Sequence, residues 1–433
     1  MRKLLPIIIS STLYAFSSAS WADTLASIYD QAKSNDPTLA SSAATRDAAF
    51  ESINEFKSYT LPQIDLSGGL NKNISSEELR ESQVLSAGIN ATHPLYERSS
   101  WITLTITEKT ARQVDASYAA AQQDLIIRVA DAYFNVLRAQ DNLEFVKAEK
   151  TAVGRQLEQT KQRFEVGLSA ITDVHDAQAQ YDAVLADEVL AQNELNNSYE
   201  GLTEITSNDH SDLYVLNTQR FSATRQDSPS NVLLKEAESK NLSLLSARIS
   251  KDIAKESITL AQAGKSPTVL LTGGYNYGDD MDNETMDAYT DLSIGVNVSM
   301  PLYTGGRIDS EVKQAQFEYI AASQDLEATH RGVVKNVRAF SNNINAAIGA
   351  LKAYEQSVVS AKSALQATEA GFDVGTRTIV DILDATRRLY DANSKLSNAR
   401  YDYILSVLQL KQATGSLSEQ DILDINAGLT AVK

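Results

Sequence analysis

Two segments that lie 208 residues apart repeat nearly the same sequence and carry acidic side chains at matching positions. Residues 164–177 and 372–385 each place a Val-Gly pair inside a long helical pattern, and aspartates follow the pair. Asp381 and Asp384 in the second copy are three residues apart, so a helix would present both carboxylates on one face. Grouped carboxylates attract cations, repel anions and raise one another's pKa. On the residues alone, a solvated helix face is the commoner explanation of such a pair.

Patterns typical of enzymes and metal sites are weak in this sequence. Residues 264–266 (Gly-Lys-Ser) resemble the end of a phosphate-binding loop, but Thr259 stands where that loop requires its first glycine. The histidines are scattered and have no metal-ligand spacing: His93, His175, His210 and His330. No Gly-x-Ser-x-Gly nucleophile elbow occurs. We therefore expect no enzyme activity, no cofactor and no metal site.

The N-terminal residues predict export. Arg2 and Lys3 precede an apolar run at 4–16, and the small-x-small sequence at 20–22 predicts a signal peptide of residues 1–22 with a mature chain from Asp23. Thirteen apolar residues are too few to span a bilayer, and no other stretch reaches eighteen, so membrane insertion would require β-strands. The chain has no cysteine, hence no disulfide and no lipid-anchoring thiol. A formal charge of −17 disfavours nucleic acid as a partner.

Proline placement divides the chain into two similar halves. Two long stretches, 95–228 and 302–433, contain no proline and are rich in helix-forming residues. We predict a first repeat at 23–230 and a second at 231–433, each with two strands followed by a long helical hairpin. The expected strands lie near 61–72, 84–93, 267–278 and 290–300, and the expected hairpins at 97–205 and 303–413, followed by a C-terminal equatorial segment. The polar segment 206–230 is expected to connect the halves at the middle of the long helices.

The expected strands are about ten residues long and alternate apolar with polar side chains. Leu292, Ile294 and Val296 alternate with Ser293 and Gly295. Strands of this length cross a bilayer when tilted, although an ordinary half-buried sheet gives the same pattern. The signal peptide and the aromatic residues near the strand ends favour a membrane barrel. Four strands cannot close a barrel, so several chains would have to share one. Two chains would give eight strands and three would give twelve, and the strand spacing is compatible with both.

The expected helices carry a seven-residue repeat. Apolar residues recur at this spacing in the second hairpin: Ile382, Leu389, Leu396, Tyr403 and Leu410. A helix over 97–165 would be roughly 100 Å long at about 1.5 Å per residue. Such helices could form a thin wall with water on both sides or a solid antiparallel coiled coil, and the pattern alone leaves both open.

Long ordered motifs make the sequence similar to the TolC family of outer-membrane efflux proteins. The matching pieces are Val-Gly-Leu-x-Ala-Ile-Thr-Asp-Val at 166–174, Val-Gly-Thr-Arg-Thr-Ile-Val-Asp-x-Leu-Asp-Ala-Thr at 374–386, Pro-Leu-Tyr-x-Gly-Gly at 301–306 and Ser-Leu-Ser-Glu-Gln-Asp-Ile at 416–422. The resemblance implies a mainly α chain with membrane β: a homotrimer whose twelve-stranded β-barrel in the outer membrane continues into a twelve-helix α-barrel in the periplasm. It also implies an exit duct for efflux of drugs and other small toxic molecules or type I protein secretion, with a periplasmic adaptor, an inner-membrane transporter and outer-membrane lipid as partners.

The same resemblance assigns gate residues. It implies that Asp381 and Asp384 of three chains form a carboxylate ring at the periplasmic mouth, where like charges raise their pKa. It implies a latch between Arg377 on one hairpin and Thr172 and Asp173 on another, through charge-assisted bonds of about 1.5–3 kcal/mol each. The family's latch tyrosine is replaced here by Phe372, which has no hydroxyl to share.

The Val-Gly pairs are expected at the hairpin tips. A plain helix–turn–helix bend explains them, and the resemblance adds that the tips dock the adaptor. The tip residues are Val166, Gly167, Leu168, Val374, Gly375 and Thr376. His175 near the mouth and the acidic loop 279–289 suggest pH sensitivity or ion binding, but solvated side chains are the commoner explanation.

Two other functions would share some of these sequence features. A trimeric coiled-coil adhesin would gather its strands at the C-terminus, whereas the strands expected here are split between the halves. A soluble periplasmic adaptor would need only one hairpin.

Overall fold

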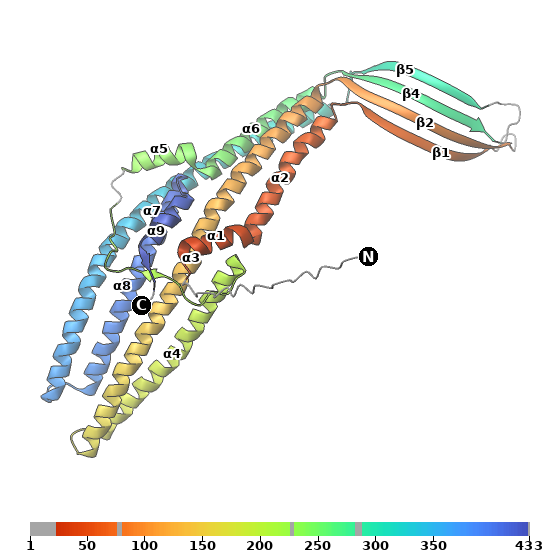
Figure 1. Ribbon diagram of the computed structural model, residues 1–433. Helices are drawn as coiled ribbons and strands as arrows, with labels where there is room; N and C mark the ends of the chain where they lie inside the picture. The colour runs from red at the N-terminus through yellow and green to blue at the C-terminus, as the bar shows by residue number, and fades with distance from the viewer. Residues whose placement is uncertain (1–22, 76–79, 226–228, 282–287, 432–433) are drawn as a thin grey trace, which may run out of the picture.

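The computed structural model describes residues 23–75, 80–225, 229–281 and 288–431, so the expected signal peptide lies outside the described residues. The chain is elongated, with a four-stranded sheet at one end and two long helical hairpins at the other (Figure 1). Within the described part of the chain, no helix has the length and apolar character needed to cross a membrane.

Two very long helices run through most of the molecule. Helix α3 (Arg98–Glu165) has 68 residues and α7 (Arg307–Asp373) has 67. Each turns back into a 36-residue helix, α4 (Ile171–Thr206) or α8 (Ile379–Thr414). The proline-free stretches allow this length because every residue after the first turn can donate its amide to the helix.

A shorter helix precedes each strand pair at equivalent positions. Helices α2 (Pro37–Ser58) and α6 (Leu242–Ala263) both have 22 residues. Asp36 and Asn241 cap them by accepting the amides of Leu39 and Leu244 at 2.8 and 3.0 Å. Helices α1 (Leu25–Asn35) and α5 (Ser230–Lys240) lead into α2 and α6.

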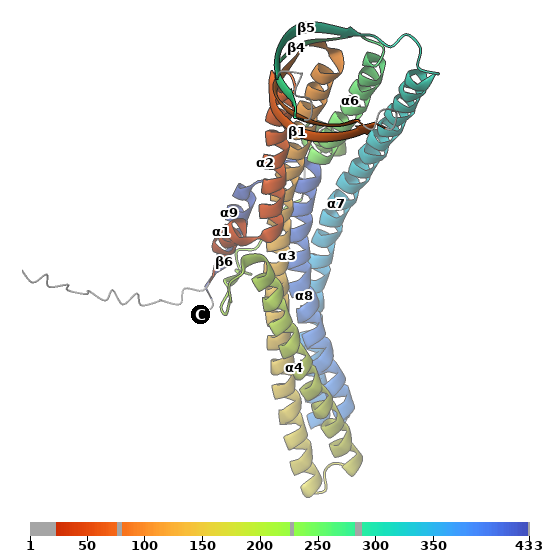
Figure 2. The ribbon, with the colours of Figure 1, turned by 90° about the vertical axis from the view of Figure 1, so that its right-hand side faces the viewer.

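The helices pack side by side in two tiers (Figures 1 and 2). Near the sheet the order is α2, α3, α6, α7, and near the hairpin tips it is α7, α8, α3, α4. In one chain, therefore, α2 and α4 lie at one edge of the row, and α7 lies at the other edge of both tiers.

The sheet is antiparallel and has the order β1–β2–β4–β5. Its strands are β1 (Gln63–Ser75), β2 (Arg80–Glu97), β4 (Thr268–Asp280) and β5 (Tyr289–Ser299). They overlap the four expected strands, and the sheet curls into an open arc (Figure 2). Strand β2 runs past the expected end because an irregularity between Pro94 and Tyr96 accommodates the missing proline amide.

The two faces of the sheet differ in polarity. The register aligns Leu66, Ile89, Tyr275 and Leu292 in one row across the four strands, all more than half exposed. The neighbouring row on the opposite face consists of Ser67, Gly88, Asn276 and Asp291. Gly88 leaves room for the Asn276 side chain, since an added Cβ would lie 2.2 Å from Asn276 Oδ1. One face is thus apolar and uncovered, and the other is polar.

The main core lies at the middle of the long helices. Tyr133 and Phe134 of α3 are fully buried, and Phe134 stacks on Tyr401 of α8 at 5.5 Å. Helix α9 (Glu419–Asn426) and a small sheet of β3 (Val215–Leu216) and β6 (Leu429–Thr430) complete this belt. The polar connector is therefore paired with the C-terminal segment at mid-height.

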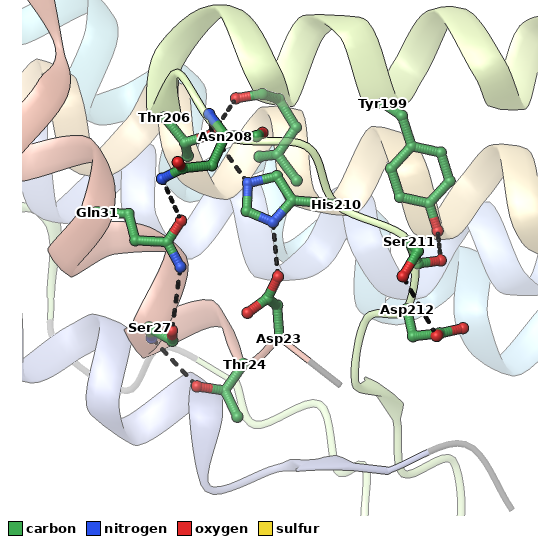
Figure 3. Close-up of polar contacts among 11 residues, drawn as sticks. Asp23, Thr24, Ser27, Gln31, Tyr199, Thr206, Asn208, His210, Ser211 and Asp212 are labelled. Carbon is green, nitrogen blue, oxygen red and sulfur yellow. Dashed lines mark hydrogen bonds and ion pairs between the residues drawn. The ribbon is translucent and has the colours of Figure 1, made fainter. Parts of the chain in front are cut away.

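Polar contacts fix residue 23 to the connector (Figure 3). His210 lies between Asp23 and Thr206, with Nδ1 2.6 Å from Asp23 Oδ2 and Nε2 2.8 Å from Thr206 Oγ1. A partly buried ion pair joins the capping residue Asp36 to Arg128 at 2.7 and 3.0 Å. The Arg128 guanidinium lowers the pKa of Asp36.

Candidate gate and hairpin tips

Both hairpin tips are built by the same backbone motif. Gly167 and Gly375 adopt φ of +75° and +79°. Their amides bond to the carbonyls of Phe164 and Phe372 at 2.9 and 3.0 Å, which is the inner bond of a Schellman motif. The outer bond follows one residue later in each copy, at 2.8 Å in both. The repeated Val-Gly pair is thus explained by the left-handed residue that ends each long helix.

The tips are exposed and partly apolar. Val166 and Leu168 are each 69% exposed, and Val374 is 75% exposed. Thr376 is exposed too, and its amide and hydroxyl donate to the carbonyl of Gly371. Each hairpin tip therefore carries a small exposed apolar surface, and both tips lie at the end of the molecule farthest from the sheet (Figure 1).

Asp381 caps helix α8. Its carboxylate accepts the backbone amide and the hydroxyl of Thr378, both at 2.9 Å, and the Thr378 hydroxyl accepts the Asp381 amide at 3.3 Å. The Thr378 amide and hydroxyl together hold the pKa of Asp381 below its usual value. Within one chain, the pKa of Asp381 is therefore lowered, whereas crowding of carboxylates in a ring would raise it.

Asp173 occupies the equivalent position at the start of α4. Its carboxylate accepts the Ala170 amide at 3.2 Å and the Ser169 hydroxyl at 2.7 Å. Ala170 has no hydroxyl that could accept the Asp173 amide, as the Thr378 hydroxyl accepts the Asp381 amide. The cap in the first copy therefore lacks one of the two reciprocal hydrogen bonds of the cap in the second. Thr172 beside it is exposed.

Arg377 contacts its own helix within one chain. Its guanidinium lies 4.0 Å from Asp381, one turn away. Among the described residues, no ion pair joins Arg377 to Asp173 of the same chain. An added Cβ at Gly371 would lie 2.8 Å from Arg377 Cγ, so the glycine makes room for the arginine stem.

Phe372 binds the two hairpins together. The Arg163 guanidinium of α3 lies over its ring at 4.6 Å, and Arg163 Nε is buried without a hydrogen-bond partner among the described residues. Around them, a cross-hairpin cluster joins both hairpins: Val153, Leu157, Ala177, Ile379, Ile382 and Leu383, with Tyr181, Leu365 and Phe372 against it. The sequence prediction did not include Arg163. The repeat could have drawn attention to Arg163, because the second copy has Gly371 at the equivalent position.

Asp384 is bridged by two arginines that the sequence prediction also missed. Arg387 reaches Oδ1 at 3.2 Å, and Arg388 reaches Oδ2 at 2.5 Å. Spacings of three and four residues on a helix were the signal for these pairs. A groove of 690 Å³ between α7 and α8 is lined by Arg377, Asp381, Asp384 and Arg388.

The described residues contain no group of three or more His, Cys, Asp or Glu positioned to hold a metal ion. His175 is exposed at the start of α4. Part of the acidic loop 279–289 lies outside the described residues.

Comparison with known proteins gives the class. The sequence profile of the family described as "Outer membrane efflux protein" matches residues 28–208 and 233–416. The outer membrane protein TolC of Vibrio cholerae is 65% identical over 100% of both chains, and that of Escherichia coli is 48% identical over 99% of this chain and 90% of the relative. A solved structure of CusC has a TM-score of 0.79 at 16% identity, covering 91% of this chain and 92% of that one.

These matches and the architecture define a mainly helical outer-membrane channel protein with a small sheet. The chain belongs to the outer membrane efflux protein family.

Proposed function

We propose that this chain is the exit duct through which an efflux or type I secretion system passes its cargo across the outer membrane. The observation that carries the proposal is the sheet, whose one face is apolar and uncovered while the other is polar. A sheet that separates lipid from a water-filled lumen needs this arrangement. The relatives named TolC support the same role.

The proposed assembly is a homotrimer closed head to tail. Strands β1 and β5 are the two edges of the sheet, and α2 and α4 lie opposite α7 at the edges of the helical tiers. Apolar side chains remain exposed along both sides, including Phe50 of α2, Val189 of α4 and Phe317 of α7. Joining one edge to the opposite edge of a copy generates a ring. Three copies would give twelve strands and twelve long helical segments around one lumen.

We place the gate at the hairpin end. Asp381 and Asp384 of three chains would form the carboxylate ring, and Arg377 would reach Thr172 and Asp173 of a neighbouring chain. This assignment fits the lack of an Arg377–Asp173 pair within the described chain, because a latch between copies needs the second copy. The exposed tips would dock a periplasmic adaptor that connects the duct to an inner-membrane transporter.

Planar bilayer recording tests the proposal. The purified protein should migrate as a heat-sensitive trimer from the outer-membrane fraction and should form channels of low conductance. Arg377→Ser should raise the conductance severalfold because the latch loses its cation. Arg331→Ser is the matched control, since it removes an exposed arginine that pairs with Glu327 on the same helix, α7. A soluble monomer in the periplasm would overturn the proposed function.

A further inference from the structure

We propose that Arg387 and Arg388 neutralise the carboxylate ring and give the mouth of this duct mixed charge, so that it admits anionic cargo and resists block by cations. The inference rests on the proposed function and concerns which cargo charge the gate selects. It adds two specificity-determining residues to the mouth.

Both oxygens of Asp384 are occupied by arginine. Arg387 and Arg388 reach different oxygens of the same carboxylate, at 3.2 and 2.5 Å. A cation that approaches Asp384 must therefore displace a guanidinium or bind beside it. The arginine side chains are 64% and 74% exposed, whereas that of Asp384 is 36% exposed. The positive groups are the more accessible part of the cluster.

The pairing continues along one face of α8. Arg377, Asp381, Asp384, Arg388, Asp391 and Lys395 follow one another at spacings of four and three residues, which keeps them on one helix face. All six line the groove between α7 and α8. Three ion pairs of opposite charge lie within this set, Arg377–Asp381, Arg388–Asp384 and Lys395–Asp391. The stripe as a whole carries no net charge.

The α7 side of the groove adds no charge to the stripe. Helix α7 contributes Ser357, Ser360, Ala361, Ala364 and Thr368 to the groove, and none of them is charged. On the opposite side, Glu149 of α3 lies within electrostatic reach of both Asp187 of α4 and Arg387, so Arg387 also offsets acidic charge there. Each chain thus brings two aspartates and three arginines to the start of α8, where Arg377 opposes Asp381 and both Arg387 and Arg388 oppose Asp384.

The test compares ion selectivity in planar bilayers under a salt gradient. Arg387→Ser/Arg388→Ser should raise the cation-to-anion permeability ratio and tighten block by a trivalent hexaamminecobalt ion, each by about tenfold, because the Asp384 carboxylates of the ring become unopposed. Arg387→Lys/Arg388→Lys should leave both quantities unchanged, since charge rather than shape carries the effect. Arg331→Ser/Arg338→Ser, which removes the same charge from exposed positions of α7, is the matched control.

A second variant distinguishes a paired ring from a bare one. Asp384→Asn should turn the channel toward anion preference, because it leaves both arginines uncompensated. In a bare carboxylate ring the same change would only weaken cation preference. Each variant is first checked for heat-sensitive trimers, so that misfolding is recognised. Channels that form normally but show wild-type selectivity in the serine variant would overturn this inference, whereas the absence of any channel would count against the proposed function.

Discussion

At the scale of single residues, the contacts of Phe372 show how a phenylalanine at this position connects the two hairpins. A hydroxyl would offer one hydrogen bond, but the ring offers a face to the Arg163 guanidinium at 4.6 Å and an apolar edge to the cross-hairpin cluster. A cation–π contact of this kind contributes about 0.5–2 kcal/mol. The two hairpins of one chain are therefore held together close to the tips without a tyrosine.

Replacing the ring should loosen this contact. Phe372→Leu keeps apolar volume but removes the π face, and Arg163→Gln removes the cation. Each change should speed hydrogen exchange at the end of α3, by an amount that corresponds to about 1 kcal/mol. The double variant should cost little more than either single one, since the two groups act as a pair. Phe372→Tyr is the control and should retain the contact; additive effects of the two single changes would contradict the pairing.

At the scale of elements, the duplication is retained most closely where backbone geometry demands it. Both tips use the same Schellman bonds and a glycine with positive φ. Both return helices begin with an aspartate that caps the first turn, Asp173 or Asp381. The copies diverge in the side chains around these caps, where Ala170 corresponds to Thr378 and Arg163 to Gly371.

Alanine at the tip glycines should therefore destabilise the hairpin ends. Gly167→Ala and Gly375→Ala force a Cβ into the left-handed region at about 1–2 kcal/mol each, although neither has a neighbouring atom within 4 Å. Faster hydrogen exchange at the tips and weaker crosslinking to an adaptor would measure the loss. Gly349→Ala, inside α7 and also in open space, should instead stabilise its helix by about 0.5–1 kcal/mol. Equal behaviour of the three variants would contradict this role of the glycines.

The elements were predictable from the sequence because each depends on local chemistry. Proline-free stretches and the alternation of Leu292 with Ser293 indicate the helices and strands directly. The extension of β2 to Glu97 was not predictable, since an irregular residue pair next to Pro94 restores the strand register. In the candidate site, the internal repeat indicated Asp381, and the family resemblance assigned gate roles to Asp381 and Arg377. The contact of Arg163 with Phe372 joins residues 209 positions apart, and no local pattern indicates such a pair.

At the scale of the whole molecule, the elements follow the same order from edge to edge in the sheet and in the helical tiers. Strand β1, α2 and α4 lie on one side, and β5 and α7 on the other. A single contact between copies would therefore extend from the proposed membrane region to the hairpins, so that barrel closure and tunnel closure depend on one another.

A lysine on the apolar face of the sheet should block assembly. Ile294→Lys near the middle of β5 exposes a charge to lipid at about 2–4 kcal/mol per chain. Its neighbour Ser293 points to the opposite, polar face, so Ser293→Lys is the matched control and should assemble normally. Heat-sensitive trimers in the outer-membrane fraction, measured on unboiled gels, should fall for the first variant only. The reverse order would mean that the faces are assigned the wrong way round.

The mid-height belt has a consequence for how the chain acquires its structure. The Ala26 amide bonds to Asn426 Oδ1 at 3.3 Å across 400 positions, and Lys33 and Tyr29 both contact Glu419. Contacts of such sequence separation form slowly, because the loop must close before they can contribute. A chain delivered from its N-terminal side would expose Leu25 and Ile28 to solvent until residues near 420 arrive. We therefore expect completion of the belt to be a late step in the folding of an exported chain.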